Sequence, residues 1–159
     1  MNITRIIPEY RGNILIDPDA VIVIQQCNTH NTFGSGIARA IREMFPLAYA
    51  ADTAAHSRKE NVLGNFSWAK VEPNRYIFNV YAQDAFGRDG KVYTNYDALR
   101  TGLQKVKMHV IENFPDKPTN ALPRIGCGLG GGDWKVVKEM IADVFADYSG
   151  HVKIVDFNV

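Results

Sequence analysis

The chain contains 159 residues, of which 46% are hydrophobic and 22% are charged, and its net charge is +1. This is enough for one domain with its own core, which we expect to span residues 1–159, and the scattered lysines and arginines exclude the strongly basic surface that nucleic acids and acidic membranes attract. The sequence shows no apolar stretch of the roughly 18 residues that a transmembrane helix needs and no signal-peptide pattern, so we expect a cytoplasmic protein. The two cysteines, Cys27 and Cys127, are expected to be free thiols.

Apolar runs and turn signals predict strands that alternate with helices. Residues 21–24, at the start of the strand predicted over 21–26, are apolar on successive positions, which is typical of a strand buried on both faces. Leu99, Leu103 and Val106 share one face of a helix. The pattern predicts an α/β fold with a mixed sheet and helices on both faces. In chain order we expect strands over 14–16 and 21–26, helices over 35–45 and 47–56, strands over 66–71 and 76–81, a helix over 95–114, a strand over 121–125, a helix over 133–147 and a strand over 151–157.

Two glycine-rich segments stand between a predicted strand and a predicted helix. The first glycine loop is residues 34–38, Gly-Ser-Gly-Ile-Ala, and the second glycine loop is residues 126–132, Gly-Cys-Gly-Leu-Gly-Gly-Gly. Glycines at such junctions let backbone N–H groups turn toward a ligand, and a helix N-terminus adds partial positive charge. The pair of loops therefore indicates a ligand with more than one phosphate group, or one that is held from two sides.

Two common nucleotide-binding motifs do not explain these loops. Neither loop carries the Lys-Ser/Thr pair of a phosphate-loop NTPase. The second loop formally matches the dinucleotide fingerprint Gly-x-Gly-x-x-Gly, but it follows a late strand, whereas the fingerprint follows the first strand of its fold.

The arrangement instead resembles the macrodomain family of ADP-ribose-binding modules. Three segments carry the resemblance: Arg11-Gly12-Asn13-Ile14, Gln26-Cys27-Asn28 with the first glycine loop, and Pro123-Arg124-Ile125 with the second. The second loop, with Asp133-Trp134 after it, is similar to the branch that contains ADP-ribose-1''-phosphate phosphatases and terminal ADP-ribose glycohydrolases. The resemblance implies a three-layer α/β/α fold with a mixed, mostly parallel central sheet of about six strands.

The resemblance also implies how the ligand would be held. Asn13 and the N–H of Ile14 match adenine contacts, Asn28 matches a contact to the distal ribose, and the two loops match the diphosphate site. Phe157 and Asn158 are placed like residues that flank adenine, although ordinary packing is an alternative for Phe157. A third loop, residues 86–91, contains Arg88 and Lys91, which would meet a terminal phosphate or simply be solvated. The expected ligand-binding residues are Asn13, Ile14, Asn28, Gly34, Ser35, Gly36, Ile37, Ala38, Gly126, Cys127, Gly128, Leu129, Gly130 and Phe157.

The chain departs from its resemblance to the glycohydrolase branch at the reactive positions. That branch uses a lysine after the strand that matches residues 80–83 and an aspartate directly after Gly-Cys-Gly-Leu, whereas this chain has no lysine there and has Gly130 in place of the aspartate. His30 is the candidate acid–base residue, and Asp133 and Asp84 are the candidate carboxylates. His30 is alternatively a solvated loop residue, and we favour an N-cap role for Asp133.

We therefore expect a phosphatase that hydrolyses ADP-ribose-1''-phosphate to ADP-ribose and phosphate, a reaction of nucleotide metabolism. The alternatives are a non-catalytic ADP-ribose reader and a hydrolase that removes ADP-ribose from a macromolecule. ADP-ribose, or a phosphorylated ADP-ribose, is the expected partner. We expect no cofactor and no metal, because no His, Cys and Asp spacing of a metal site is present.

Overall fold

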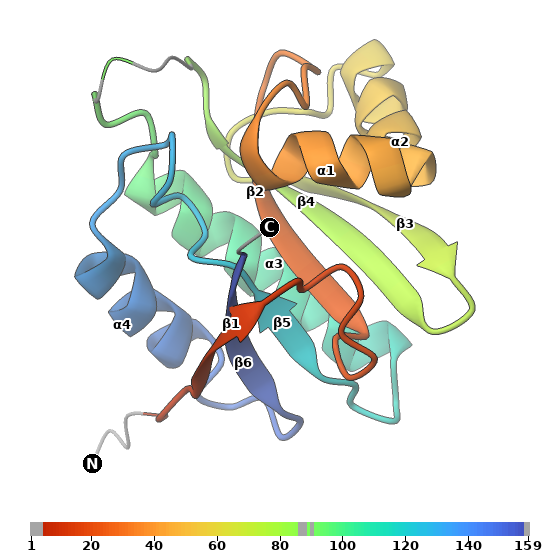
Figure 1. Ribbon diagram of the computed structural model, residues 1–159, viewed down its shortest axis with the longest axis vertical. Coiled ribbons are helices and arrows are strands. Elements are labelled where there is room, and N and C mark those ends of the chain that lie inside the picture. Colours follow the sequence, from red (N-terminus) through yellow and green to blue (C-terminus); the bar gives the residue numbers. More distant parts are fainter. Residues whose placement is uncertain (1–4, 86–88, 90, 158–159) are drawn as a thin grey trace.

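The computed structural model describes residues 5–85, 89 and 91–157, and it shows a central sheet with helices on both faces (Figure 1). The described residues form a six-stranded sheet in the order β1-β6-β5-β2-β4-β3, in which every neighbouring pair is parallel except β3 and β4. The predicted α/β fold, with three layers and a mixed, mostly parallel sheet, is confirmed. The strands are β1 (Glu9–Gly12), β2 (Ile22–Asn28), β3 (Phe66–Glu72), β4 (Arg75–Gln83), β5 (Asn120–Leu122) and β6 (Val152–Phe157), and the helices are α1 (Gly36–Met44), α2 (Pro46–Ser57), α3 (Tyr96–Asn113) and α4 (Trp134–Val144).

Alternate residues of the central strand β2 face opposite helical layers. Ile22 and Ile24 pack into the core that α3 and α4 cover, whereas Val23 and Cys27 pack into the core that α1 and α2 cover. Because successive side chains of a strand point to opposite faces, a strand between two helical layers must be apolar on both. Burial on both faces of the sheet therefore explains the continuous apolar run that predicted this strand.

The strand predicted over residues 14–16 is wrong. These residues form a turn, and the chain pairs with β6 earlier, at Glu9–Gly12. Ile14 and Leu15 are nevertheless buried, with exposed fractions of 0% and 1%, so their apolar character reflects burial without strand geometry. The edge strand β1 shows no apolar alternation, because most of its residues are exposed.

The remaining predicted elements are confirmed with shifted ends. The largest shifts affect β5, which stops at Leu122, and α4, which stops at Val144. Pro123 follows β5 directly, and its lack of an N–H group prevents it from extending the pairing.

Candidate functional site

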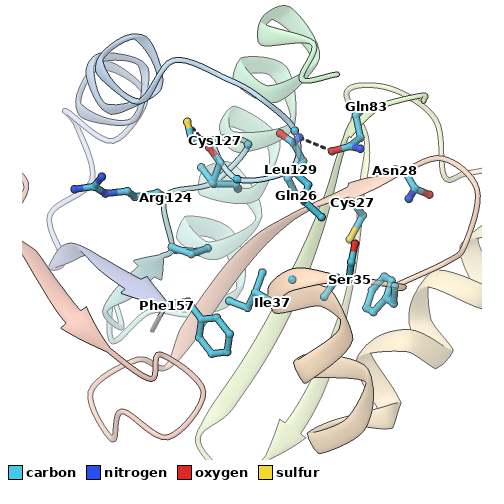
Figure 2. Close-up of a pocket in the computed structure, with 18 of the residues that line it drawn as sticks. Gln26, Cys27, Asn28, Ser35, Ile37, Gln83, Arg124, Cys127, Leu129 and Phe157 are labelled. Atoms are coloured by element: carbon cyan, nitrogen blue, oxygen red, sulfur yellow. Dashed lines mark hydrogen bonds between the residues drawn. The ribbon is translucent and has the colours of Figure 1, made fainter. Parts of the chain in front are cut away.

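A pocket of about 580 Å³ lies where β2, β4 and β6 end and where the chain leaves β5 (Figure 2). Ligands of open α/β sheets bind outside the carboxyl ends of the strands, and small-molecule sites have volumes of about 300–1,000 Å³. The structure brings both glycine loops to this pocket. Of the expected ligand-binding residues, the lining includes Asn28, Gly34, Ser35, Gly36, Ile37, Ala38, Gly126, Cys127, Gly128, Leu129, Gly130 and Phe157.

The N-terminus of α1 enters the pocket without a cap from the described residues. Ser35 occupies the N-cap position, but its side chain makes no capping hydrogen bond, and the first turn carries no acidic residue. By contrast, Asn95 caps α3 and Asp133 caps α4. The first N–H groups of a helix have no partner within the helix, and they carry partial positive charge. Residues 36–38 therefore present to the pocket a helix end with partial positive charge.

Polar side chains hold the second glycine loop from beneath. The Thr94 hydroxyl donates to the Gly126 carbonyl oxygen at 2.7 Å, and the Thr94 N–H donates to the Gly130 carbonyl oxygen at 3.0 Å. Gln26 Nε2 donates to Gln83 Oε1 at 2.9 Å (Figure 2). It also donates to Thr94 Oγ1 at 2.9 Å. This chain of contacts connects the ends of β2 and β4 to the loop, and the sequence patterns did not reveal it.

The contacts to Thr94 explain why the second loop needs glycine. A Cβ atom on Gly130 would lie 2.5 Å from Thr94 Oγ1 and 2.8 Å from the Gly126 carbonyl oxygen. Gly126 itself has φ +74°, a left-handed conformation that favours glycine. By contrast, nothing lies within 4 Å of a Cβ atom built on Gly128.

Asn28 lines the pocket at the end of β2, as expected. Its Nδ2 donates to Thr32 Oγ1 at 2.8 Å, and its Oδ1 accepts from the His30 N–H at 2.8 Å. Since an amide has two donor hydrogens and two acceptor lone pairs, each end of Asn28 keeps capacity for one more contact.

The expected adenine contacts lie in and beside the turn that follows β1. Asn13 and Ile14 are not among the residues that line the pocket, while Phe157, at the end of β6, is (Figure 2). Asn13 Oδ1 accepts from the Leu15 N–H at 3.0 Å, so part of its acceptor capacity is already used inside the turn. Adenine contacts at Asn13 and Ile14 stay predictions, and Asn158 lies outside the described residues.

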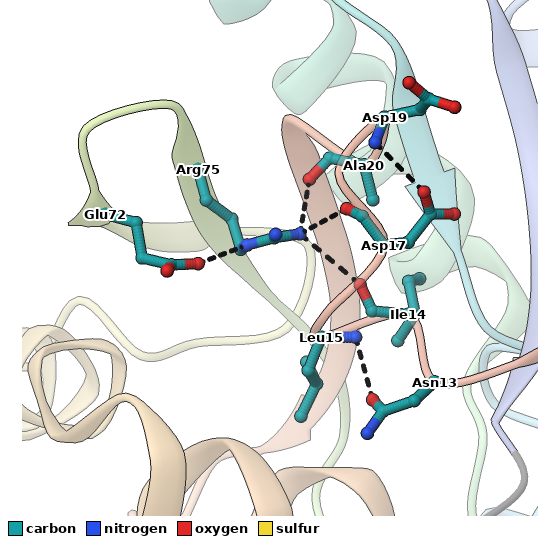
Figure 3. A network of polar contacts seen from close by, with 8 residues as sticks. All are labelled: Asn13, Ile14, Leu15, Asp17, Asp19, Ala20, Glu72 and Arg75. Carbon is teal, nitrogen blue, oxygen red and sulfur yellow. Dashed lines mark hydrogen bonds and ion pairs between the residues drawn. The ribbon is translucent and has the colours of Figure 1, made fainter.

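Arg75 fastens the same turn to the β3–β4 hairpin (Figure 3). This side chain is only 9% exposed at the residue level, and its guanidinium donates to the carbonyl oxygens of Asp17 and Ala20 at 2.9 Å each and of Ile14 at 3.5 Å. Its Nε also pairs with the Glu72 carboxylate at 2.6 Å. Arg75 thus satisfies backbone oxygens of a turn in which Ile14 and Ala20 are buried.

Neither His30 nor Asp133 lines the pocket directly. His30 is exposed in the turn after Asn28, and its backbone N–H donates to Asn28. The Asp133 carboxylate caps α4 by accepting from the Lys135 N–H at 2.9 Å, so the favoured N-cap interpretation of Asp133 is confirmed. Catalytic roles for His30 and Asp133 stay predictions.

Both cysteines are free, as expected, and both line the pocket. Burial raises the pKa of the Cys127 thiol to about 11, and the nearby charge of Asp133 contributes to this shift. Burial also raises the pKa of Cys27 well above its ordinary value. Because the thiolate is the reactive form, neither cysteine is suited to act as a nucleophile at neutral pH.

The third loop lies largely outside the described residues, which exclude 86–88, and therefore Arg88, and also 90. Lys91 is described, and its ammonium group lies 3.7 Å from the Asp89 carboxylate. Among the described lining residues, Arg124 and Asp156 are the charged ones, and they lie 3.9 Å apart. The positive and negative side-chain charges of the described lining therefore cancel. Any attraction of this lining for anions would come from backbone N–H groups.

The described part of the chain lacks two kinds of structural feature. It contains no group of three or more His, Cys, Asp or Glu side chains that could hold a metal ion. It also contains no helix that combines the length and apolar character needed to cross a membrane.

Comparison with known proteins identifies relatives over most of the chain. No family model matches it. An uncharacterised 17.5 kDa protein from the tk-vs intergenic region of Enterobacteria phage T4 is 33% identical over 133 residues, which is 81% of this chain and 80% of the phage protein. An ADP-ribose 1''-phosphate phosphatase of Candida albicans is 27% identical over 72% of this chain and 76% of its own length.

A DNA ADP-ribosyl glycohydrolase of Thermus aquaticus is 25% identical over 88% of this chain, although the match spans only 38% of that longer protein. The solved macrodomain of Thermus aquaticus DarG superimposes with a TM-score of 0.79 and 25% identity, over 95% of this chain and 97% of that one. The fold and these relatives define a three-layer α/β module whose two glycine loops meet at one pocket. The chain belongs to the macrodomain family.

Replacing Gly130 by alanine is predicted to destabilise the second glycine loop. The methyl group would overlap Thr94 Oγ1 and the Gly126 carbonyl oxygen, so the free energy of unfolding should fall by about 1–3 kcal/mol in urea denaturation. Gly128→Ala is the matched control and should change it by less than about 0.5 kcal/mol, because that position is open. Equal effects of the two substitutions would contradict the packing argument.

Replacing Arg75 by methionine is predicted to lower the free energy of unfolding by about 2–4 kcal/mol, because buried carbonyl oxygens lose their donor. The same denaturation measurement on Arg39→Met provides the control. Arg39 pairs with Glu43 at 3.2 Å on an exposed helix surface, where such a pair contributes about 0.5 kcal/mol or less. A loss at Arg75 no larger than the loss at Arg39 would show that the turn does not depend on this side chain.

Proposed function

We propose that the protein binds ADP-ribose in the pocket between its two glycine loops and hydrolyses ADP-ribose-1''-phosphate to ADP-ribose and phosphate. The observation that carries the binding proposal is the uncapped N-terminus of α1, which faces the second glycine loop across the pocket. Backbone N–H groups from two sides suit a diphosphate, and the pocket has the size of a small-molecule site.

The relatives support this choice of ligand and reaction. Two of the related proteins are ADP-ribose 1''-phosphate phosphatases, and a third is a DNA ADP-ribosyl glycohydrolase. In the proposed reaction, a water oxygen attacks phosphorus and the bond between phosphorus and the distal ribose oxygen breaks. His30 would accept a proton from the attacking water, and this proton would then pass through solvent to the released ribose oxygen. Backbone N–H groups would stabilise the phosphoryl oxygens, since they are preorganised donors.

A second candidate function is removal of ADP-ribose from DNA. The similarity to the Thermus aquaticus glycohydrolase and to its macrodomain structure favours this candidate. An ADP-ribosylated DNA oligonucleotide, incubated beside ADP-ribose-1''-phosphate, distinguishes the two reactions by the product that is released.

Ser35→Asp is predicted to weaken ADP-ribose binding without destabilising the fold. The new carboxylate would cap the N–H groups of α1 and repel the diphosphate, so the dissociation constant from titration calorimetry should rise at least about tenfold. The melting temperature should stay the same or rise, because aspartate is a favourable N-cap residue. Ser35→Ala is the control and should keep its stability, since the hydroxyl caps nothing among the described residues. Unchanged affinity in Ser35→Asp would contradict the proposed anion site.

His30→Ala is predicted to slow the release of phosphate from ADP-ribose-1''-phosphate by about 100-fold or more, because a positioned acid–base group contributes about 10²–10⁴-fold. The measurement is phosphate release by purified protein, and His151→Ala is the control, because His151 is an exposed histidine before β6. Full activity in His30→Ala would exclude His30 as the base. Tight binding of ADP-ribose with no release by the unmodified protein would leave a non-catalytic reader.

A further inference from the structure

A buried carboxylate lies behind the first glycine loop and has no role in the proposed chemistry. Asp52 of α2 is 0% exposed. Its Oδ1 accepts from the Tyr81 hydroxyl at 2.6 Å, and its Oδ2 accepts from Asn31 Nδ2 at 2.7 Å. Both partners are neutral, and Asp52 forms no ion pair within the described part of the chain. Since a carboxylate is costly to bury without a charged partner, its position calls for an explanation.

One partner of Asp52 connects it rigidly to the sheet. Tyr81 belongs to β4 and is 0% exposed, and its hydroxyl also lies 2.7 Å from Ser67 Oγ of β3. Ser67 Oγ in turn accepts from Asn79 Nδ2 at 3.0 Å. The hydroxyl of Tyr81 is thus held by groups on two strands, and Asp52 is anchored to a fixed donor.

The other partner of Asp52 belongs to a strained turn that leads into the pocket. Asn31 has φ 58° and Phe33 has φ 41°, and both angles lie in the left-handed region that bulky residues disfavour. Phe33 is 4% exposed, and its ring packs at 5.1 Å against Tyr49 of α2, whose hydroxyl donates to the Asn31 carbonyl oxygen at 2.9 Å. Asn31 Nδ2 also donates to Thr53 Oγ1 at 3.1 Å. Helix α2 therefore holds this turn through several contacts.

The turn determines where the first glycine loop lies. Residues 29–33 connect Asn28, at the end of β2, to the loop, and Thr32 and Phe33 themselves line the pocket. A backbone donor binds an anion only if its direction is fixed before the ligand arrives. A change at Asn31 would therefore reorient the uncapped N-terminus of α1.

We propose that Asp52 is a positioning residue, whose carboxylate holds Asn31 and thereby fixes the strained turn that presents the first glycine loop to the ligand. A carboxylate suits this position because one neighbour donates to each of its oxygens. The identity of the ligand rests on the proposed function, whereas the fixing of the turn does not.

An exchange of the two side chains tests this proposal. Asp52→Asn places an amide N–H group against a donor, and Asn31→Asp places two carboxylates together. The double variant Asn31→Asp/Asp52→Asn restores the contact with its polarity reversed, because the amide introduced at position 52 would donate to the carboxylate introduced at position 31 and still accept from Tyr81. Aspartate is also tolerated in the left-handed conformation of position 31. Tyr148→Phe is the control for loss of a polar contact elsewhere, since the Tyr148 hydroxyl donates to the Pro118 carbonyl oxygen before β5 and Tyr148 does not line the pocket.

Two measurements are needed, amide hydrogen exchange over residues 28–39 without ligand and ADP-ribose affinity by calorimetry, both well below the melting temperature. We expect each single variant to exchange at least about tenfold faster in this segment and to bind at least about tenfold more weakly, and the double variant to return within about threefold of the unmodified protein in both. Tyr148→Phe should keep both values while its melting temperature falls, because the Pro118 carbonyl oxygen loses this donor.

The outcomes separate this proposal from the proposed function. Unchanged exchange in both single variants, or no recovery in the double variant, overturns the role of Asp52. Faster exchange with unchanged affinity overturns the link to the ligand. If the unmodified protein does not bind ADP-ribose, the proposed function fails, and the exchange measurement alone still decides whether Asp52 holds the turn.

Discussion

In the proposed function, the pocket binds its ligand through backbone N–H groups. A backbone donor points at a ligand only if the segment that carries it is held in place. The charged side chains of the described lining, Arg124 and Asp156, lie 3.9 Å apart and balance each other. In the proposed function, the attraction for phosphate therefore comes from the N–H groups at the end of α1 and in the second glycine loop. Such dipoles act over a short range, so the precision of the loops matters more than the net charge of the protein.

Buried polar side chains provide that precision, and each loop has its own set. Thr94 holds the second glycine loop by hydrogen bonds to two of its carbonyl oxygens. Gln26 in turn donates to the Thr94 hydroxyl. Asp52 and Asn31 hold the turn before the first loop. Polar groups in these positions cost free energy unless their partners are well placed, so each set also specifies one arrangement of its loop.

The fold and the main features of the site could be predicted from the sequence, because they depend on local patterns. Strand β2 is apolar on both faces between two helical layers, and glycines mark the strand-to-helix junctions. The edge strand β1 could not be predicted, since its exposed residues carry no periodic signal and its pairing with β6 joins the two ends of the chain. In sequence, the turn at Ile14 and Leu15 resembles a strand, because buried positions are apolar whether the backbone forms a strand or a turn. The supporting contacts were also missed: Gln26 and Thr94 are 68 positions apart, and Asn31 and Asp52 are 21 apart, so no spacing rule reveals them.

The same packing bears on the reaction. The glycohydrolase branch that this chain resembles places an aspartate where this chain has Gly130, and here the space for any side chain at that position is taken by Thr94 Oγ1 at 2.5 Å. An aspartate at position 130 would therefore displace the Thr94 side chain, which supports the loop. A single substitution of Gly130 would not restore the carboxylate without disturbing the loop. A reaction in this pocket must then use catalytic side chains at positions other than 130. Asp133, which already caps α4, and His30, in the turn that Asn28 stabilises, are held by contacts of their own, so either would act from a fixed backbone. A reaction that needs only one such group and strong backbone donors, as hydrolysis of a phosphate ester does, fits this arrangement better than one that needs a lysine and an aspartate together.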